Sequence, residues 1–270
     1  MKPRRDKMKI TSILLHNDAV SPFIPETVEM NRMELIRMLN DYKMVYLKPN
    51  RGVKGKGIMK VAKLPNTKRM PFLYKYNQLR KTTVRRFPTF PAMFKVIHHH
   101  AINKRYLIQQ GIPLLRYNNK ITDLRIMVQK NLVDTWEITG IMVKVAVPNR
   151  IVTHSFYGAK LITLKQLLQP HTYDNNAAWI REQIRDITYN IAQEVEVHYP
   201  SYRDLGIDLG IDTSLQPWIL EVNFRSPDLS IFRKFNKKMY RKMVLYRRKN
   251  LRLISSRTFQ DEINNPENVT

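Results

Sequence analysis

The sequence predicts an α+β protein in which β-hairpins alternate with amphipathic helices. Apolar and polar residues alternate in pairs of short segments joined by turn residues, which is the pattern of hairpins. Two other segments, residues 179–197 and 229–255, instead carry large apolar residues at every third or fourth position, which predicts helices. The 270 residues can hold one large domain or two small ones.

The first 62 residues predict a tail, a helix and two strands. Residues 1–20 are interpreted as a basic tail followed by one strand. Asn31 and Glu34 have the spacing of a capping box, so a helix is expected from there to about Asp41. Two strands, Met44 to Lys48 and Ile58 to Ala62, then flank a loop that is rich in glycine and lysine.

That loop contains Gly52, Gly55 and Gly57, with two lysines between them. A strand follows it, whereas the Walker A and dinucleotide motifs both require a helix there, so neither motif applies. A glycine-rich hairpin tip is instead typical of a flexible flap whose backbone N–H groups can approach phosphate oxygens. A plain solvated turn remains the alternative for this loop alone.

The middle of the chain predicts a strand and then a further hairpin. Tyr106 to Leu115 reads as a short apolar strand that leads into an extended connection. Asp123 to Val128 and Trp136 to Val147 read as hairpin partners. Asp123 and Arg125 share one face of the first partner because alternate strand residues point the same way.

The segment from Leu205 to Asn223 is the most informative part of the sequence. It predicts a hairpin with its turn at Ser214 and Leu215, which places position 208 opposite position 221. Asp208, Glu221 and Asn223 then share one face, and the register predicts that Leu209 pairs with Leu220 and Ile211 with Trp218 on the buried face. Three oxygen ligands on a rigid hairpin suit Mg²⁺. An ordinary solvated face is the alternative.

Charge points to polyanionic partners. The formal net charge is +25, and residues 42–122 and 229–260 contain no acid but 19 and 11 Lys and Arg residues, respectively. The acidic hairpin lies between these blocks, as a metal–phosphate site requires. The chain has no Cys, which excludes disulfides, thiolate metal sites and a Cys nucleophile. No apolar run is long enough to cross a bilayer, and a cytoplasmic protein is expected.

Two other functions are disfavoured. Basic and aromatic residues interleave between residues 63 and 106, but without the signature of a nucleic-acid-binding module, so nucleic acid is not expected as the main partner. His98, His99 and His100 are consecutive, and their side chains diverge on a helix or a strand, which disfavours a metal site there.

Four motifs, in this order, resemble the ATP-grasp superfamily: a strand that ends in Lys48-Pro49, the glycine-rich flap, Asp123-Leu-Arg125, and Asp208 followed by Glu221-Val-Asn223. The residues in and around these motifs are most similar to those of the YheC/YheD-type branch, which is associated with the endospore coat. The similarity covers about residues 21–235. Many ATP-grasp enzymes carry a larger domain before the first of these motifs, and many have an acid in the hinge where Gln109, Gln110 and Gly111 stand here.

The resemblance implies an ATP-grasp fold in which two α+β subdomains enclose a nucleotide site. Residues 43–106 would form the flap subdomain, residues 107–235 the metal-binding subdomain, and residues 236–270 a basic C-terminal helix and tail. Arg125 and Lys144 would face the γ-phosphate and the acyl phosphate, and would be the catalytic residues. The resemblance implies metal ligation by Asp208, Glu221 and Asn223, and ATP binding by Lys48, Gly52, Lys54, Gly55, Lys56, Gly57, Gln109, Gln110, Gly111 and Ile112.

The activity implied by the resemblance is ligation of a carboxylate to an amine through an acyl phosphate, with ATP and Mg²⁺. In such a reaction the protein mainly positions the reactants and neutralises charge. The alternative is a non-catalytic, basic coat or scaffold protein that keeps the fold and binds an anionic polymer or a membrane surface. The sequence leaves both functions open, and it does not name the carboxylate or the amine.

Overall fold

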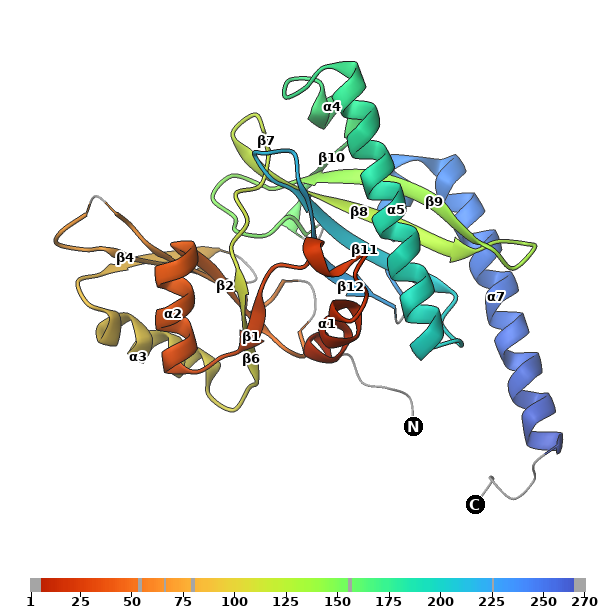
Figure 1. The fold of residues 1–270 in the computed structure, drawn as a ribbon, viewed down its shortest axis with the longest axis horizontal. Coiled ribbons are helices and arrows are strands. Elements are labelled where there is room, and N and C mark those ends of the chain that lie inside the picture. Colours follow the sequence, from red (N-terminus) through yellow and green to blue (C-terminus); the bar gives the residue numbers. More distant parts are fainter. Residues whose placement is uncertain are drawn as a thin grey trace.

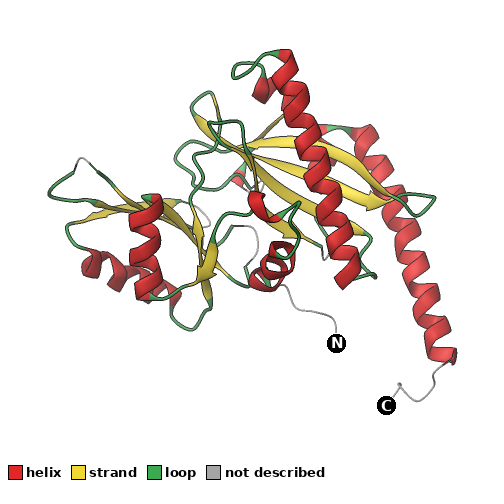
Figure 2. Ribbon diagram, in the orientation of Figure 1, coloured by secondary structure: helices red, strands yellow, loops and turns green. Residues whose placement is uncertain are grey.

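The chain forms two α+β bodies, each built on an antiparallel sheet (Figure 1, Figure 2). The structure is a computed structural model that describes residues 6–52, 55–65, 67–78, 81–154, 157–224 and 226–264, with the backbone alone for 174, 175 and 255–264. The α+β class predicted from the sequence is confirmed.

The first sheet has the strand order β1-β6-β2-β3-β4-β5. Helices α2 (Arg32–Tyr42) and α3 (Phe90–Ala101) cover one face of it, where Leu35, Val45 and Ile97 share one core. The other face looks towards the second body (Figure 1). The strands are β1 (Thr27–Glu29), β2 (Met44–Pro49), β3 (Met59–Lys63), β4 (Phe72–Asn77), β5 (Thr82–Phe87) and β6 (Tyr106–Gln110).

The second sheet has the order β10-β9-β8-β11-β12, and β7 pairs with β8. Helix α5 (Asp174–His198) packs on one face through Ile184, whereas α6 (Ser230–Phe235) and α7 (Lys237–Asn264) cover the opposite face. The short helix α4 (Leu164–Leu168) precedes α5. The strands are β7 (Arg116–Tyr117), β8 (Lys120–Lys130), β9 (Trp136–Val145), β10 (Lys160–Ile162), β11 (Asp204–Ile211) and β12 (Pro217–Asn223).

The strand expected within residues 1–20 is wrong, because this segment forms helix α1 (Lys7–Leu15) followed by the 3₁₀ turn η1 (Ser21–Phe23). The Asp6 carboxylate caps α1 by accepting the N–H of Lys9 at 3.1 Å. Ile10 and Leu14 lie one helical turn apart and are buried in the core that α5 shares. Ile10 and Leu14 therefore form the buried face of this helix, whereas Leu15 is exposed.

The predicted hairpins and the first predicted helix are present. Strands β2 and β3 flank the flap, β8 and β9 form the second hairpin, and Asn31 caps α2 by accepting the N–H of Glu34 at 2.9 Å. Strand β6 pairs with β1 and β2, so it belongs to the first sheet. The division of the chain into domains at residues 21, 43, 107, 236 stays a prediction.

The expected C-terminal helix is two helices. Asn236 has extended backbone dihedrals between α6 and α7, and its side chain accepts the N–H groups of Lys238 and Met239 at 3.0 Å each. An Asn side chain that caps a new helix also ends the old one, because its backbone leaves the helical region.

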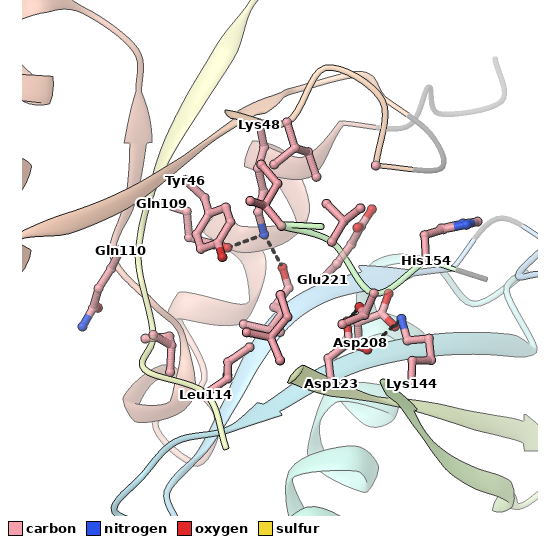
Figure 3. A pocket seen from close by; sticks show the side chains of 18 residues that line it. Tyr46, Lys48, Gln109, Gln110, Leu114, Asp123, Lys144, His154, Asp208 and Glu221 are labelled. Atoms are coloured by element: carbon pink, nitrogen blue, oxygen red, sulfur yellow. Dashed lines mark hydrogen bonds and ion pairs between the residues drawn. The ribbon is translucent and has the colours of Figure 1, made fainter. Parts of the chain in front are cut away.

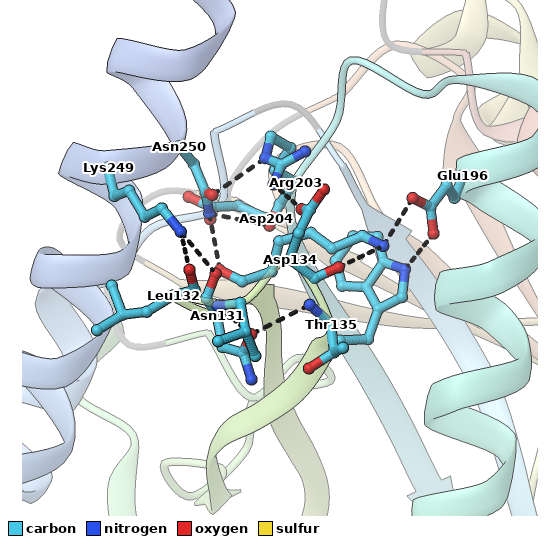
Figure 4. Close-up of polar contacts among 12 residues, drawn as sticks. Asn131, Leu132, Asp134, Thr135, Glu196, Arg203, Asp204, Lys249 and Asn250 are labelled. Carbon is cyan, nitrogen blue, oxygen red and sulfur yellow. Dashed lines mark hydrogen bonds and ion pairs between the residues drawn. The ribbon is translucent and has the colours of Figure 1, made fainter.

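Helix α7 docks on the second sheet through polar contacts as well as through the fully buried Met243. Asn250 donates to the carbonyl of Lys130 at 3.1 Å and accepts from Arg203 at 3.0 Å, and Arg203 also pairs with Asp134 (Figure 4). A solvated basic face is the simplest interpretation of the Lys and Arg rows on this helix, but Arg247 pairs with Asp204 at 2.5 Å. The basic side chains of α7 therefore face solvent only in part.

Candidate functional site

Two adjoining cavities lie between the two sheets, and together they form a cleft. The first measures about 120 Å³ and the second about 310 Å³. The cleft contains all the described residues that the sequence marked for metal binding and catalysis, and most of those marked for ATP. The residues that line both cavities are Lys48, Gly55, Ile58, His154, Asp208 and Glu221.

The first cavity has an apolar end. Tyr46 from β2, with Ile112 and Leu114 from the segment after β6, forms one part of its wall (Figure 3). Ile151, Val152 and Leu220 close the other side. Apolar walls with a few polar groups are typical of pockets for flat organic ligands.

The hinge predicted from Gln109 to Ile112 lies at this end, but its residues differ in role. Gln109, Gln110 and Ile112 line the first cavity, whereas Gly111 does not. The N–H of Gly111 donates to the carbonyl of Met44 at 3.0 Å, and a Cβ atom at Gly111 would lie only 2.6 Å from that oxygen. Glycine is required here because the backbone of the hinge lies directly against β2.

The side chains of the two hinge glutamines are held by hydrogen bonds. Gln109 accepts from the Lys48 ammonium at 2.5 Å and donates to the Thr27 hydroxyl at 3.2 Å. Gln110 points away from the cavity and accepts the N–H of Glu26 at 3.2 Å (Figure 3). The amide of Gln109 thus orients Lys48, which the sequence did not predict.

Lys48 leaves the end of β2 at the junction of the two cavities. Its ammonium also lies 3.5 Å from the carbonyl of Leu220, on the opposite sheet. Burial lowers the pKa of Lys48 to about 8, and the nearby Glu221 carboxylate opposes this shift. A cation that is buried with few counter-charges is suited to receive an anionic ligand.

A second lysine at this site was missed by the sequence analysis. Lys7, in the first turn of α1, lies 3.6 Å from Glu221 and donates to the carbonyls of Pro49 and Gly52 at 3.4 Å each. It lines the second cavity. The assignment of residues 1–20 to a tail hid this role. The spacing of Asp6, Ile10 and Leu14 was the signal for the helix that places Lys7 there.

The flap closes the second cavity. Gly52, Gly55 and Lys56 line it, whereas Lys54 lies outside the described residues. Gly57 has a φ of +81°, which favours glycine, and its carbonyl accepts from the Tyr106 hydroxyl at 3.0 Å. These contacts anchor the base of the flap to the first sheet.

Opposite the flap, four charged side chains of the second sheet form one network. Asp208 pairs with Arg125 at 3.0 Å. Asp208 also pairs with Lys144 at 2.9 Å, and Lys144 lies 3.1 Å from Asp123 (Figure 3). The side chains of Asp208 and Lys144 are only 10% and 5% exposed. The strand register brings these four side chains together. Asp208 on β11 lies opposite Arg125 on β8, and Asp123 on β8 lies opposite Lys144 on β9.

The pKa values of the two acids in this network are shifted in opposite directions. Burial alone would raise the pKa of Asp208, but Arg125 and Lys144 hold it below its usual range. Burial raises the pKa of Asp123 above its usual range, since Lys144 and the Thr153 hydroxyl offset only part of the desolvation. Both acids raise the pKa of Lys144, although burial opposes that shift.

The metal-ligand prediction fits the geometry of the hairpin, with one correction. Asp208 lies opposite Glu221, and Asn223 lies 3.5 Å from the Asp208 carboxylate. A register shift follows Asp208, however, so Leu209 pairs with Ile219 and Ile211 with Pro217. The predicted pairing of Leu209 with Leu220 and Ile211 with Trp218 is therefore wrong, and Ile219 takes the buried position.

These three residues suit a metal ion that is shared with a ligand. Among the described residues, no group of three or more His, Cys, Asp or Glu side chains could hold a metal by itself. Two carboxylates and an amide are nevertheless a sufficient protein contribution for Mg²⁺, which is commonly held by one or two carboxylates together with water and phosphate oxygens.

His154 was not predicted as a site residue, yet it lines both cavities. Burial lowers the pKa of His154, and the nearby Lys144 adds to this shift, so the neutral imidazole is favoured. The neighbouring Thr153 donates to Asp123. Neither role could be predicted from the sequence, because the loop from Thr153 carries no regular pattern.

Comparison with known proteins finds two relatives of the same kind. The chain is 27% identical over 231 residues to the endospore coat-associated protein YheD, and 23% identical over 230 residues to YheC, both of Bacillus subtilis (strain 168). Each match covers 84% of this chain, but only 49% of YheD and 61% of YheC, so the chain spans about half the length of these relatives.

The fold is similar to that of the D-cycloserine synthetase DcsG. The TM-score is 0.53 at 11% sequence identity, over 90% of this chain and 70% of that protein. This likeness supports the fold, and at such low identity it does not extend to the substrate. A family description, YheC/D-like ATP-grasp, matches residues 2–249. From this match over nearly its whole length, the chain belongs to the YheC/D-like ATP-grasp family.

Proposed function

We propose that the cleft binds ATP with Mg²⁺ and that the protein is a carboxylate–amine ligase that acts through an acyl phosphate. The observation that carries this proposal is the continuity of the cleft. An apolar compartment at the hinge, suited to a base, opens directly into a compartment with lysines on one side and carboxylates on the other. Family membership supports ATP as the nucleotide.

Phosphate binding is assigned to the lysines on the first side. Lys48 and Lys7 lie within reach of the same carboxylate, Glu221, so their charges converge on one spot. Phosphates at this spot would take the place of Glu221 as the counter-charge of both lysines. Gly52, Gly55, Lys56 and Gly57 would cover the phosphates with the flap, and Lys54 keeps the flap role that the resemblance implies.

Asp208, Glu221 and Asn223 would hold Mg²⁺, whose chemistry here is to neutralise charge on the phosphates. Arg125 and Lys144 are proposed to face the transferred phosphoryl group and the acyl phosphate. Both cations are held in place by Asp208, which limits their movement while charge develops nearby. The amine would then attack the acyl carbon, and phosphate would leave.

One observation favours the alternative of a non-catalytic protein that binds an anionic polymer. Both oxygens of Asp208 already have cationic partners, Arg125 and Lys144, so this metal ligand is compensated without a metal. The basic blocks would supply the polymer contact. Mg·ATP binding distinguishes the two proposals, because a scaffold that has lost its nucleotide function has no need of it.

Association with the endospore coat is proposed from the similarity to YheD and YheC, which are endospore coat-associated proteins. Within the described residues, no helix is both long enough and apolar enough to cross a membrane.

The test is calorimetry with ATP, with and without Mg²⁺, on the wild type and on Glu221→Ala. Loss of one metal ligand is expected to weaken Mg·ATP binding about tenfold, which is roughly 1.4 kcal/mol, and to affect metal-free ATP less. Glu182→Ala is the matched control, since Glu182 is an exposed acid on α5. Unchanged Mg·ATP binding in Glu221→Ala would contradict the metal assignment, and no binding to the wild type would contradict the proposed function.

A further inference from the structure

A third cavity, of about 470 Å³, lies behind the apolar end of the cleft. It shares Tyr46, Ile112, Leu114 and Ile121 with the first cavity, so the two cavities adjoin at these residues. Lys60 of the first sheet borders it on one side, and Arg116 and His171 of the second body border it on the other. The proposed ATP site uses none of these three residues.

Strand register explains why Lys60 faces this cavity. Tyr46 on β2 pairs with Lys60 on β3, which pairs with Lys75 on β4, so the three form one row across the sheet. The alternate residues Val45, Val61 and Tyr74 fill the core under α2 and α3. Lys60 and Lys75 are therefore on the face that looks towards the second body.

This cavity carries positive charge without acidic partners. None of the residues that line it is an Asp or a Glu. Within the described part of the chain, Lys60 has no ion pair or hydrogen bond, and its ammonium meets only the ring of Tyr46, 5.8 Å from the centroid. Burial lowers the pKa of Lys60 to about 8, and the charges of Lys75 and Arg116 add to the shift.

Lys60 is half-buried, whereas the fully buried cations Lys130, Lys144 and Arg203 all have acidic partners. Lys130 pairs with Glu196 at 2.7 Å, Lys144 pairs with Asp208, and Arg203 pairs with Asp134. A charge that is removed from water without a partner is costly, so such positions in folded proteins usually have one. At Lys60 the chain does not supply the partner, and an anionic ligand in the cavity would.

We propose that this third cavity binds a small organic anion, whose carboxylate or phosphate group lies between Lys60 and Arg116 and whose apolar part packs against Ile112 and Leu114. The two cations on opposite walls attract the charged group, and the apolar hinge residues between them offer no hydrogen bonds to a wholly polar ion. The ligand would touch the same hinge residues as the base of a bound nucleotide, from the opposite side.

The experiment measures the acylation rate of individual lysines in the full chain, by mass spectrometry of peptides, without ATP or Mg²⁺. Phenyl phosphate and benzoate serve as separate probes, so the two kinds of anion are distinguished, and sodium chloride at equal ionic strength is the reference. Only the neutral amine reacts, so a bound anion that raises the pKa of Lys60 by about one unit slows its acylation about tenfold. Lys95, an exposed lysine on α3, should not change.

Two variants locate the anion. In Arg116→Gln the protection of Lys60 should be lost, and this change is tolerable for folding because the side chain is exposed and donates only to the carbonyl of Asn119. Lys95→Gln is the matched control and should keep the protection.

Equal acylation of Lys60 with both probes and with chloride would overturn the proposal. So would protection of Lys48 without Lys60, because the anion would then be in the nucleotide cleft, and so would full protection in Arg116→Gln. Since neither ATP nor Mg²⁺ is present, these results do not depend on whether the proposed ligase function is correct.

Discussion

The two sheets that face each other across the cleft balance their charges in opposite ways. On the second sheet, the buried cations Arg125 and Lys144 pair with Asp208 at 3.0 and 2.9 Å. On the first sheet, Lys48 meets a neutral glutamine amide, and Lys60 meets only an aromatic ring. The charges of the second sheet neutralise one another, whereas the first sheet presents positive charge to a ligand that enters the cleft.

This difference indicates that the two sheets have different roles in the site. Paired charges on the second sheet are fixed in place by the protein, so they form a preorganised wall. Unpaired charges on the first sheet lower the stability of the empty protein, and an anionic ligand relieves that cost. The comparison can be tested by removing charges from each sheet in turn.

The largest effect is expected from the second sheet. Asp208→Ala removes the shared acid, which is the described ion-pair partner of Arg125, and leaves Lys144 with Asp123 alone, so the free energy of unfolding should fall by about 3 kcal/mol. Urea denaturation measures this loss. Asp18→Ala, at an exposed acid, should change stability little. A loss of less than about 1 kcal/mol for Asp208→Ala would mean that the network does not stabilise the sheet.

A smaller effect on a different property is expected from Lys48→Met on the first sheet. This change keeps the apolar stem and removes the charge, so Mg·ATP affinity should fall about tenfold, or roughly 1.4 kcal/mol. The unfolding midpoint without ligand should not fall, because a poorly compensated cation does not stabilise the apo protein. If instead apo stability drops sharply and ATP binding survives, Lys48 is structural and the contrast between the sheets fails.

The pH dependence of stability sharpens the contrast at Lys60. Its folded-state pKa, about 8, lies below the ordinary value of a lysine, so between these values the unfolded state binds more protons than the folded state. Stability therefore rises with pH in that window, and below about pH 8 the buried charge is a full penalty. Lys60→Met should be more stable than the wild type at pH 7, and this advantage should shrink towards pH 10. A constant difference in thermal midpoint across that range would show that Lys60 is solvated.

The smallest effect on stability is expected on α7. Replacing the exposed Lys238, Arg241 and Arg248 with Gln should weaken salt-sensitive retention on an anionic matrix and change the free energy of unfolding by about 0.5 kcal/mol or less. Deleting residues 236–270 is a poor test of this surface, because it would also remove the buried Met243 and Asn250. Retention equal to that of the wild type would place the polyanion contact in the block from 42 to 122.

Many elements of the fold follow from local patterns. Alternation predicted the strands on both sides of the flap and the hairpin that joins Asp208 to Glu221, because side chains on a strand change face at every residue. Period 3.6 predicted α5, which runs from Asp174 to His198 and so extends beyond the expected bounds. The same reasoning failed where a register shift moved Ile219 to the buried face, since a bulge leaves no mark in a period-2 pattern.

Local sequence patterns were enough to predict the hairpins β2–β3, β8–β9 and β11–β12, the flap and the acidic face of the last hairpin, because each depends on residues that lie close together in the chain. Tertiary structure alone decided which distant groups meet. It brought Lys7 to Glu221, Gln109 to Lys48 and Lys144 to Asp208, across separations of 61 to more than 200 positions. Local patterns carry no information on these contacts, because the contacts depend on how the two sheets and α1 pack together. This packing brings charged residues that are distant in the sequence into one site.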